Sequence, residues 1–422
     1  MPTPSPPLRT VPGTADDVVL LDERFAADPH AVYALLREQR PVTRAQAPGA
    51  PPFWLVTRYE DVRAALADPR LVKDAATLFG PAAAAGLGGL DVHDHMLNSD
   101  PPKHTRLRKL VTKAFTAKAI ARLRPRIEAL AVELVDAVAA RLADGEPSVD
   151  LIDALAFPLP MTVICEILGV PDDRRGDFRT WSHAILSPAT PQQFVTASAE
   201  MREYLVRLVA DKRAHPDDAM LSAIIAPDDH GDELSDAEAT GMASLLLVAG
   251  HETTVNLIGN GALASLRGPG QWARLRADPA SLPGAVEEFL RLDSPVNTAT
   301  VRFAAEPVTL GGTTIPTGQT VLLAIGSANR DPAAFDHPDD LDLHRPRGGS
   351  LAFGHGIHYC LGAALARLEG EIAFRVLLDR LPDLELATDP AEVGWQPSLL
   401  IRGLTHLPVR LHQVPSPAPK RG

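Results

Sequence analysis

Cysteine is scarce in this chain, because only Cys165 and Cys360 occur among its 422 residues. Two cysteines cannot form the disulfide framework of a small secreted protein. Cys165 lies in the apolar run Val-Ile-Cys-Glu-Ile-Leu, which predicts core packing, since free cysteine usually behaves as a small hydrophobic residue. Cys360 lies among glycines and is not explained in this way.

Long apolar runs and an excess of positive charge are also missing. No stretch of 18 apolar residues occurs, and the N-terminus has neither the basic nor the apolar segment of a signal peptide. These absences predict a soluble, cytoplasmic protein that does not enter a membrane. The chain has 41 basic and 53 acidic residues, and its formal net charge is -12. A nucleic acid partner is therefore excluded, because phosphate binding requires a basic surface.

Helical periodicity dominates the sequence, because apolar residues recur at three- and four-residue spacing in most segments. The predicted helices are 32–37, 60–67, 104–115, 119–143, 151–168, 192–213, 236–266, 282–292 and 361–381. Strand signals are short and few. The predicted strands are 52–57, 308–310, 320–325 and 407–411. The pattern predicts a mainly α fold with a small β region.

No linker divides the chain, although its length alone would allow about two or three domains. The proline-rich ends predict disordered tails at 1–19 and 412–422, which leaves one domain at 20–411. A low-complexity piece rich in alanine and glycine, 81–90, is predicted to be mobile.

The segment 353–362 reads Phe-Gly-His-Gly-Ile-His-Tyr-Cys-Leu-Gly and delivers Cys360 to the first turn of a predicted helix. The partial positive charge of a helix N-terminus favours a thiolate, so we expect the pKa of Cys360 to be lowered. Gly354 and Gly356 permit positive φ and a close approach of the backbone to a ligand. Gly362 would let the helix lie against a flat macrocycle, and Phe353 would shield the sulfur from water.

A loop with a structural cysteine is the alternative, but it leaves the framing phenylalanine and glycines unexplained. The segment therefore predicts a thiolate ligand to the iron of a haem group. No C-x-x-C-H motif is present for covalent attachment, so the haem would be held non-covalently.

The predicted helix 236–266 contains Leu-Val-Ala-Gly-His-Glu-Thr-Thr at 247–254, in which polar residues interrupt an apolar run. Gly250 lacks the bulk that would block a diatomic ligand, and a hydroxyl at Thr253 that competes for a backbone carbonyl would open the helix into a bulge. A helix with polar residues on its solvated face is the alternative. The stretch also begins like the zinc motif H-E-x-x-H, but Val255 replaces the second histidine and excludes that site.

Together these motifs resemble the signatures of the cytochrome P450 superfamily. The resemblance implies a single-domain triangular prism that holds haem b between the long central helix and the helix after the cysteine. It implies Cys360 as the axial iron ligand, and Glu252 and Thr253 as the residues that relay protons during oxygen activation. The implied haem contacts are His104, Arg108, Ala249, Gly250, Arg302, Phe353, Gly354, Gly356, His358 and Gly362.

The resemblance further implies a structural triad and a substrate wall. Glu288 and Arg291, three residues apart on one helix, would be joined by Arg345 to fix the loop that positions the cysteine. The residues implied around the substrate are Val248, Ala249, Val296, Asn297, Thr298, Leu399 and Leu400, together with segments 77–97 and 185–188. Most are apolar or small, which predicts a bulky hydrophobic substrate that Asn297 and Thr298 would hydrogen-bond.

The implied activity is that of a monooxygenase, which inserts one oxygen atom of O2 into its substrate. The chain carries no G-x-G-x-x-G after a strand and no flavin or iron-sulfur segment, so electrons derived from NAD(P)H would arrive through ferredoxin reductase and ferredoxin. A basic run without an acid predicts the ferredoxin docking patch, although a solvated helix face is the alternative. This basic run consists of Lys103, Arg106, Arg108, Lys109, Lys113, Lys118, Arg122, Arg124 and Arg126.

Within the superfamily, the chain resembles monomeric bacterial enzymes of actinomycete secondary metabolism, above all the macrolide and polyketide hydroxylases of antibiotic biosynthesis. A polyketide macrolactone is the first expectation for the substrate, and a sterol-like or terpenoid molecule is the second. Two other functions stay open. One is a peroxide-driven enzyme without a reductase, against which Glu252 and Thr253 argue, and the other is a cysteine-ligated haem sensor or carrier without turnover.

Overall fold

The computed structural model describes residues 8–11, 18–80, 94–186, 190–268 and 270–412. The predicted mobile segment 81–90 lies outside these residues, as do 1–7 and 413–422 of the predicted tails. Among the described helices, none combines the length and the apolar character needed to span a membrane.

The predicted boundary of the N-terminal tail at residue 19 is wrong for the residues that the structure describes. The amide of Val11 donates to the carbonyl of Val18 at 2.8 Å, and the amide of Leu20 donates to the carbonyl of Arg9 at 2.8 Å. Val18 and Val19 are buried. Paired backbone and buried valines therefore extend the ordered part of the chain before residue 20. At the other end, the amide of His412 donates to the carbonyl of Asp383 at 2.8 Å.

A long helix, α12 (Asp236–Arg267), runs through the helical part of the molecule. Its N-terminus carries a capping box, in which Ser235 accepts from the amide of Glu238 and the Glu238 carboxylate accepts from the amide of Ser235. The helices that pack against it include α8 (Pro158–Leu168), α10 (Pro191–Ala214), α14 (Leu282–Leu292) and α16 (Ala363–Arg380). α16 in turn packs against α7 (Ala117–Ala143).

A glycine allows three of these helices to approach closely. A Cβ atom on Gly261 of α12 would lie 2.7 Å from both Phe289 of α14 and Phe374 of α16. The two phenylalanine rings are fully or almost fully buried, with centroids 4.8 Å apart. Gly261 therefore fixes the distance between the central helix and the helix that follows Cys360.

Each predicted helix overlaps an observed one, but the predicted helix 151–168 is interrupted. A π-helical turn at Ile152–Ala156 precedes α8, which begins at Pro158. Proline has no amide hydrogen to donate, so it suits the first turn of a new helix better than the interior of a continuous one. The remaining helices are α1 (Glu23–Ala27), α2 (Pro29–Gln39), α3 (Tyr59–Ala67), α4 (Ala75–Phe79), α6 (Lys103–Thr112), α9 (Arg175–Leu186), α11 (Met220–Ile225), α13 (Gln271–Ala277) and α15 (Ile325–Ala328).

The strands form one mixed sheet of six strands and two small sheets. The large sheet has the order β1 (Val19–Leu20), β2 (Val42–Gln46), β3 (Phe53–Val56), β9 (Thr320–Leu323), β6 (Arg302–Ala304) and β4 (Leu71–Val72). The small sheets are β10 (Leu384–Leu386), β11 (Pro408–Leu411) and β5 (Val149–Asp150), and the hairpin of β7 (Val308–Leu310) and β8 (Thr313–Ile315). Most strands that the sequence did not predict have only two or three residues, too few for an alternating pattern.

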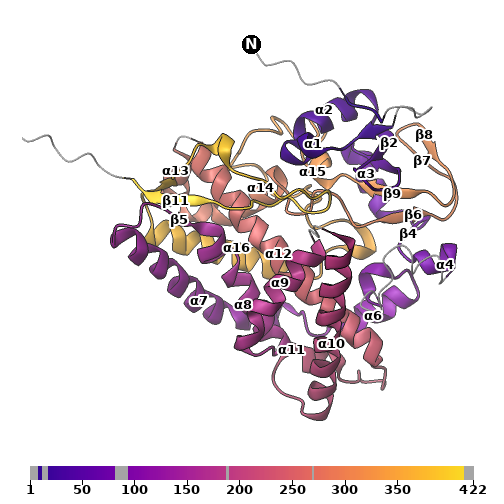
Figure 1. Ribbon diagram of the computed structural model, residues 1–422, viewed down its shortest axis with the longest axis horizontal. Helices are drawn as coiled ribbons and strands as arrows, with labels where there is room; N and C mark the ends of the chain where they lie inside the picture. The colour runs from indigo at the N-terminus through magenta and orange to yellow at the C-terminus, as the bar shows by residue number, and fades with distance from the viewer. Residues whose placement is uncertain (1–7, 12–17, 81–93, 187–189, 269, 413–422) are drawn as a thin grey trace, which may run out of the picture.

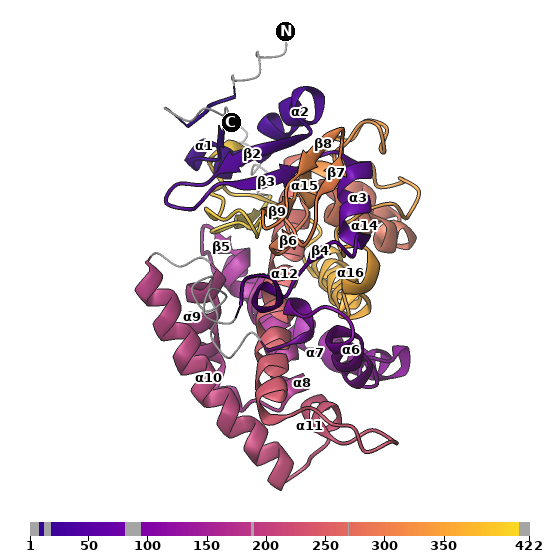
Figure 2. The same cartoon turned by 90° about the vertical axis from the view of Figure 1, so that its right-hand side faces the viewer.

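The model has a roughly triangular outline in Figure 1, with the large sheet and α1 to α3 in one corner and the long helices filling the rest. Turned by 90°, Figure 2 shows α12 passing between the sheet side and the α8 and α11 side. The predicted mainly α fold with a small β region is confirmed. α12 and α16 pack together, so the segment before α16 lies close to the middle of the molecule.

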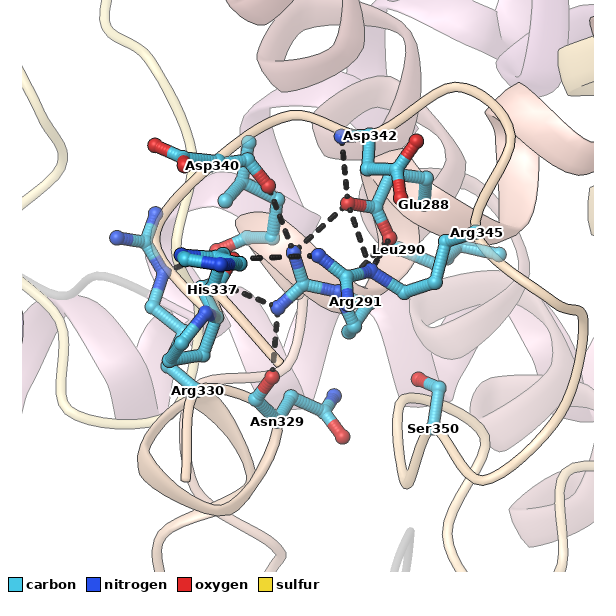
Figure 3. Close-up of polar contacts among 12 residues, drawn as sticks. Glu288, Leu290, Arg291, Asn329, Arg330, His337, Asp340, Asp342, Arg345 and Ser350 are labelled. Atoms are coloured by element: carbon cyan, nitrogen blue, oxygen red, sulfur yellow. Dashed lines mark hydrogen bonds and ion pairs between the residues drawn. The ribbon is translucent and has the colours of Figure 1, made fainter. Parts of the chain in front are cut away.

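An ion cluster at the end of α14 ties down the loop at 336–345 (Figure 3). The Glu288 carboxylate lies 2.8 Å from the Arg291 guanidinium and 3.0 Å from that of Arg345. The side chains of Glu288 and Arg291 are each 2% exposed. The structure thus brings the three predicted triad residues together, and it buries two of them.

The two arginines also bind backbone carbonyls of the same loop. Arg291 donates to the carbonyls of Asn329, Pro338 and Asp340, while Arg345 donates to those of Asp336 and His337. The amide of Asp342 donates to Glu288 at 3.0 Å. The loop that leads toward Cys360 is therefore held by buried charges.

Replacing Glu288 by alanine should lower the free energy of unfolding by about 3–5 kcal/mol, because it leaves two arginines without their acid. Chemical denaturation followed by circular dichroism measures this loss, and we expect poorly folded, haem-free protein in the same preparations. Glu146→Ala is the control, because it removes an exposed ion pair with Arg141 and should leave stability nearly unchanged. Equal stability and haem content in the two variants would contradict the structural role of Glu288.

Candidate active site

Cys360 lies at the end of a tight loop that is closed by backbone hydrogen bonds. The amide of Cys360 donates to the carbonyl of Phe353 at 2.8 Å, and the amide of Gly354 donates to Leu351 at 2.8 Å. Gly354 and Gly356 both have a φ of 75°, the left-handed conformation predicted for them. A Cβ atom on Gly356 would also lie 3.1 Å from the carbonyl oxygen of Leu66. The loop therefore requires these two glycines.

Two details of the predicted loop differ. α16 begins at Ala363, so Cys360 precedes the helix and does not lie in its first turn. Cys360 is exposed, but desolvation by the surrounding protein still raises the pKa of its thiol, although the amide of Gly362 and the positive charges of Arg108 and Arg367 act in the opposite direction. The predicted low pKa of the free thiol is therefore wrong. A bound metal cation would itself favour the thiolate.

The aromatic and glycine residues around Cys360 leave space beside the sulfur. A Cβ atom on Gly362 would come no closer than 4.0 Å to the Cys360 sulfur. The Phe353 ring lies under the guanidinium of Arg367, 4.4 Å from the ring centroid. Arg367 is also paired with Glu287 of α14. Phe353 is thereby fixed next to the loop, where it was predicted to shield the sulfur.

Three of the predicted haem contacts meet beside this loop. The rings of His104 and His358 are 4.4 Å apart between centroids. Arg108 donates to the carbonyl of Tyr359 at 2.7 Å. Burial, with Lys73 and other cations nearby, lowers the pKa of His358 to about 3, and burial with the charge of Arg108 lowers the pKa of His104.

Arg302 reaches the same region from β6. Its guanidinium donates to the carbonyls of Leu71 and Leu66 at 3.1 Å each. Burial lowers the pKa of Arg302 to about 10, although the acids Asp100 and Asp68 raise it. The pairing of β6 with β4 places Arg302 next to the chain that leads into α4.

Lys73 is a member of this cationic cluster that the sequence analysis missed. Its side chain is buried and its ammonium donates to the carbonyls of Thr300 at 3.0 Å and Val301 at 2.8 Å. Burial and the charge of Arg302 lower its pKa well below the ordinary value. The available signal was a lysine that directly follows the apolar pair Leu-Val at 71–72. A lysine in such a place would be buried only if it had partners, because lysine is almost never fully buried without them.

The cluster fits a haem group. Among the described residues, the buried nitrogens without a hydrogen-bond partner include Nε2 of His104, Nε2 of His358 and Nε of Arg302. Asp100 and Asp68 act on these cations only from beyond ion-pair distance. Buried donors and cations without an ion-paired acid favour an anionic ligand, and haem carries two propionate groups. The thiol of Cys360 would hold the iron while these side chains hold the propionates.

The motif on α12 is presented to the site by an open helix face. Ala249 is exposed and Thr253 is partly exposed, although most of the neighbouring residues on this central helix are buried. The hydroxyl of Thr253 donates to the carbonyl of Ala249 at 2.9 Å. Ala249 and Thr253 are one turn apart, so they share one face.

Two predictions for this helix are wrong. α12 is α-helical from Asp236 to Arg267, so the hydroxyl of Thr253 does not open it into a bulge. A Cβ atom on Gly250 would lie 2.9 Å from the side chain of Ile164 on α8. Gly250 therefore permits close packing of α12 on α8, and the space that it provides is not directed at a ligand of the iron.

Glu252 lies on a different face of α12 from Thr253, because consecutive residues of a helix do not face each other. Its carboxylate accepts a hydrogen bond of 3.4 Å from the side-chain amide of Gln396 and lies 3.7 Å from Nε2 of His251. His251 is fully buried, and burial lowers its pKa. The structure thus places the predicted acid against the C-terminal part of the chain.

The predicted substrate wall is assembled from two segments that lie side by side. Val296 pairs with Ile401 in an isolated bridge, and the amide of Asn297 donates to the carbonyl of Leu400 at 2.8 Å. Val248, Val296, Leu399 and Leu400 are partly exposed. The predicted segments 77–97 and 185–188 lie partly outside the described residues.

Asn297 and Thr298 were predicted to hydrogen-bond a substrate, but their side chains form hydrogen bonds within the protein. Asn297 accepts from the Tyr33 hydroxyl at 3.2 Å and donates to the carbonyl of Leu399 at 3.1 Å. The Thr298 hydroxyl donates to the same carbonyl at 3.1 Å, and both residues are buried. Their polar groups are used inside the protein and hold the two wall segments together.

The basic run at 103–126 is less positive than its sequence indicates. Arg106 pairs with Asp232 at 2.9 Å and Glu238 at 2.8 Å, and Lys109 pairs with Asp228 at 3.0 Å. Lys103, Arg124 and Arg126 also have acidic partners. Of the nine residues of this basic run, Arg108, Lys113, Lys118 and Arg122 have no acidic partner among the described residues.

Comparisons with known proteins agree with this site. The family model described as Cytochrome P450 matches residues 280–390. Cytochrome P450 107B1 of Saccharopolyspora erythraea is 50% identical over 409 residues, covering 94% of this chain and 98% of the relative. The 6-deoxyerythronolide B hydroxylase of the same organism is 45% identical over 404 residues, covering 93% and 98%.

A solved structure shows the same architecture. The tirandamycin C-bound P450 monooxygenase TamI superposes with a TM-score of 0.85 at 50% identity, covering 93% of this chain and 100% of that one. Such identity over nearly the whole length shows common descent with these proteins. The chain therefore belongs to the cytochrome P450 superfamily and is a haem-dependent monooxygenase.

Proposed function

We propose that this enzyme hydroxylates a bulky, hydrophobic polyketide, and specifically a macrolactone. It would use non-covalently bound haem b, O2, and electrons that pass from NAD(P)H through ferredoxin reductase to ferredoxin. The observation that carries this proposal is the loop of Cys360 beside buried cationic donors without acidic partners, because this combination suits a haem held by sulfur and by its propionates.

The chemistry divides between the cofactor and the chain. Haem with a thiolate ligand activates O2 for insertion into an unactivated C–H bond. Cys360 would hold the iron, and His104, Arg108, Arg302 and His358 would hold the propionates. Glu252 and the Thr253 hydroxyl would deliver protons at the open face of α12.

The choice of substrate is supported by relatives and by the wall residues. One relative acts on 6-deoxyerythronolide B, a name whose ending denotes a lactone, and a similar structure binds tirandamycin C. The partly exposed residues at the predicted wall are apolar, namely Val248, Val296, Leu399 and Leu400. With Asn297 and Thr298 occupied inside the protein, shape and apolar contact would dominate recognition.

The ferredoxin docking surface is proposed at a groove of about 970 Å³ beside the Cys360 loop. Arg108, Lys113 and Ile357 are among the residues that line this groove. Ile357 is 49% exposed. Asp228 and Asp229 also line the groove, and Asp228 pairs with Lys109. The positive charges of Arg108 and Lys113 beside an exposed apolar residue would suit an acidic electron-transfer protein, which meets its partner through complementary charge.

Macrolactones should convert the ferric protein from low to high spin, because a bulky apolar ligand displaces water from the haem pocket. A titration followed in the Soret region measures this shift for a panel of macrolactones, steroids and terpenoids. Tight binding of macrolactones and weak or no binding of the other two classes is expected. A preference for steroids or terpenoids would overturn the proposed substrate class and leave the haem assignment intact.

Replacing Thr253 by alanine should lower the product formed per NAD(P)H consumed by at least about tenfold, because the hydroxyl that guides protons is lost. Peroxide release should rise by a corresponding amount. The control is Thr254→Ala, which alters the neighbouring buried threonine. A peroxide-driven enzyme would show the same peroxide-supported turnover with either residue at 253, and a haem sensor would show no turnover at all.

Lys113→Ala, in the groove, and Lys118→Ala, in the same basic run, should each raise the dissociation constant for ferredoxin severalfold at low ionic strength, because each removes a positive charge without an acidic partner. The difference should disappear at high salt, where exposed charges are screened. Titration of the ferric protein with ferredoxin measures the constant. Arg141→Ala, on the far part of α7, is the control, and an equal effect of all three changes would exclude docking at this surface.

A further inference from the structure

One face of α12 carries a buried polar stripe that contacts the C-terminal hairpin at 395–404. Glu252, Asn256 and Asn260 are spaced by four residues, and all three are buried. A helix that buries three polar side chains in a row requires a polar partner along the whole face. The hairpin supplies hydrogen-bond partners for Glu252 and Asn260, whereas Nδ2 of Asn256 and Oδ1 of Asn260 have none among the described residues.

Each residue of the stripe meets the hairpin at a different point. The Glu252 carboxylate accepts from the side-chain amide of Gln396 at 3.4 Å. Asn256 packs so closely on Gly403 that a Cβ atom there would lie 2.0 Å from the asparagine oxygen. Asn260 donates to the carbonyl of Arg402 at 2.9 Å. These contacts hold the base of the hairpin, at Gln396, Arg402 and Gly403, against α12.

The same hairpin carries the predicted substrate contacts at its tip. Trp395 pairs with Leu404, and the amide of Gln396 donates to the carbonyl of Gly403 at 2.9 Å, which closes the base. Leu399 and Leu400 lie at the turn, where their carbonyls accept from Asn297 and Thr298. One continuous element therefore joins the acid on α12 to the apolar wall.

His251 lies on the other side of the Glu252 carboxylate. Nδ1 of His251 lies 2.8 Å from the carbonyl of Leu247, so this nitrogen must carry the hydrogen, and Nε2 of the neutral ring is an acceptor. Within the described residues, Nε2 has no hydrogen-bond partner. Nε2 lies 3.7 Å from one oxygen of the Glu252 carboxyl, and the other oxygen of that carboxyl accepts from the side chain of Gln396.

We propose that Gln396 is a positioning residue that, with His251, holds the Glu252 carboxyl on the hairpin side of α12 and links its release toward Thr253 to substrate contact at Leu399 and Leu400. The inference rests on the proposed role of Glu252 in proton delivery. In this arrangement, the tip of the hairpin contacts the substrate and its base contacts Glu252. Without substrate, the acid stays turned away from the face that Thr253 occupies.

Gln396→Leu tests the proposal, because leucine keeps the size of the side chain but donates no hydrogen bond. With a substrate found in the spin-shift screen, the product formed per NAD(P)H should fall about threefold to tenfold, in line with the loss of one hydrogen bond. The solvent deuterium isotope effect on turnover should increase. The spectrum of the ferrous carbon monoxide adduct and the affinity for the substrate should stay as in the wild type.

Leu400→Ala, alone and combined with Gln396→Leu, tests the link between tip and base. If both substitutions act through the hairpin, the double variant should form as much product per NAD(P)H as the single variant that forms less. If the two losses multiply instead, the substitutions act independently and the link is overturned. Thr405→Val is the control, because it changes a hydroxyl at the hairpin base that contacts Gly394 and His406, away from Glu252. It should leave coupling unchanged.

Glu252→Gln separates this inference from the function on which it rests. If Glu252→Gln leaves coupling intact, the proposed proton route fails and the positioning role fails with it. If Glu252→Gln uncouples the enzyme but Gln396→Leu and His251→Gln do not, only the positioning role is overturned. Uncoupling in all three variants, with normal haem spectra, is the result that the structure predicts.

Discussion

Burial of positive charge without an ion-paired acid is the constraint on which the site depends. Lys73, Arg302 and the edge-to-face rings of His104 and His358 lie beside the Cys360 loop, where burial lowers the pKa of each of them. A buried cationic cluster of this kind is costly in isolation, and an anionic ligand removes the cost. The thiol shows the complementary behaviour, because desolvation raises its pKa and a bound metal would reverse that effect. Haem, with an iron and two propionates, satisfies both requirements at once.

The central helix, α12, presents different residues on two of its faces. Ala249 and Thr253 lie on the accessible face, and Glu252, Asn256 and Asn260 lie on the face that is bound to the hairpin. Glycine sets the spacing on the remaining sides, with Gly250 against Ile164 and Gly261 against two phenylalanines. The helix thus fixes Thr253, Glu252 and the segments at 296–298 and 399–400, which carry the proposed roles in proton delivery and substrate binding, relative to one another. On the proximal side, the buried ion cluster around Glu288 holds the loop that leads to Cys360.

Local patterns in the sequence predicted the parts of the site that are local in space. The glycines around Cys360, the motif at 247–254 and the pair Glu288 and Arg291 each lie within one turn or one loop. Contacts across the fold were not predictable in this way. Lys73 is buried against Thr300, Asn297 is hydrogen-bonded to Tyr33, and Arg106 and Lys109 of the basic run are paired with Asp232 and Asp228. The sequence pattern contains no signal for these pairings, because the partners are brought together only by the tertiary fold. The same is true of Gln396, which lies 144 residues from the acid that it contacts.

Reduction of the purified protein under carbon monoxide tests the central claim most directly, because only a thiolate ligand gives the strongly red-shifted Soret band. The account predicts this band in the wild type and in Cys165→Ser, whose cysteine is buried in the core, and its loss in Cys360→Ser. A colourless protein from cells supplied with haem precursor, or a carbonyl adduct with the absorption of a histidine-ligated globin, would contradict it.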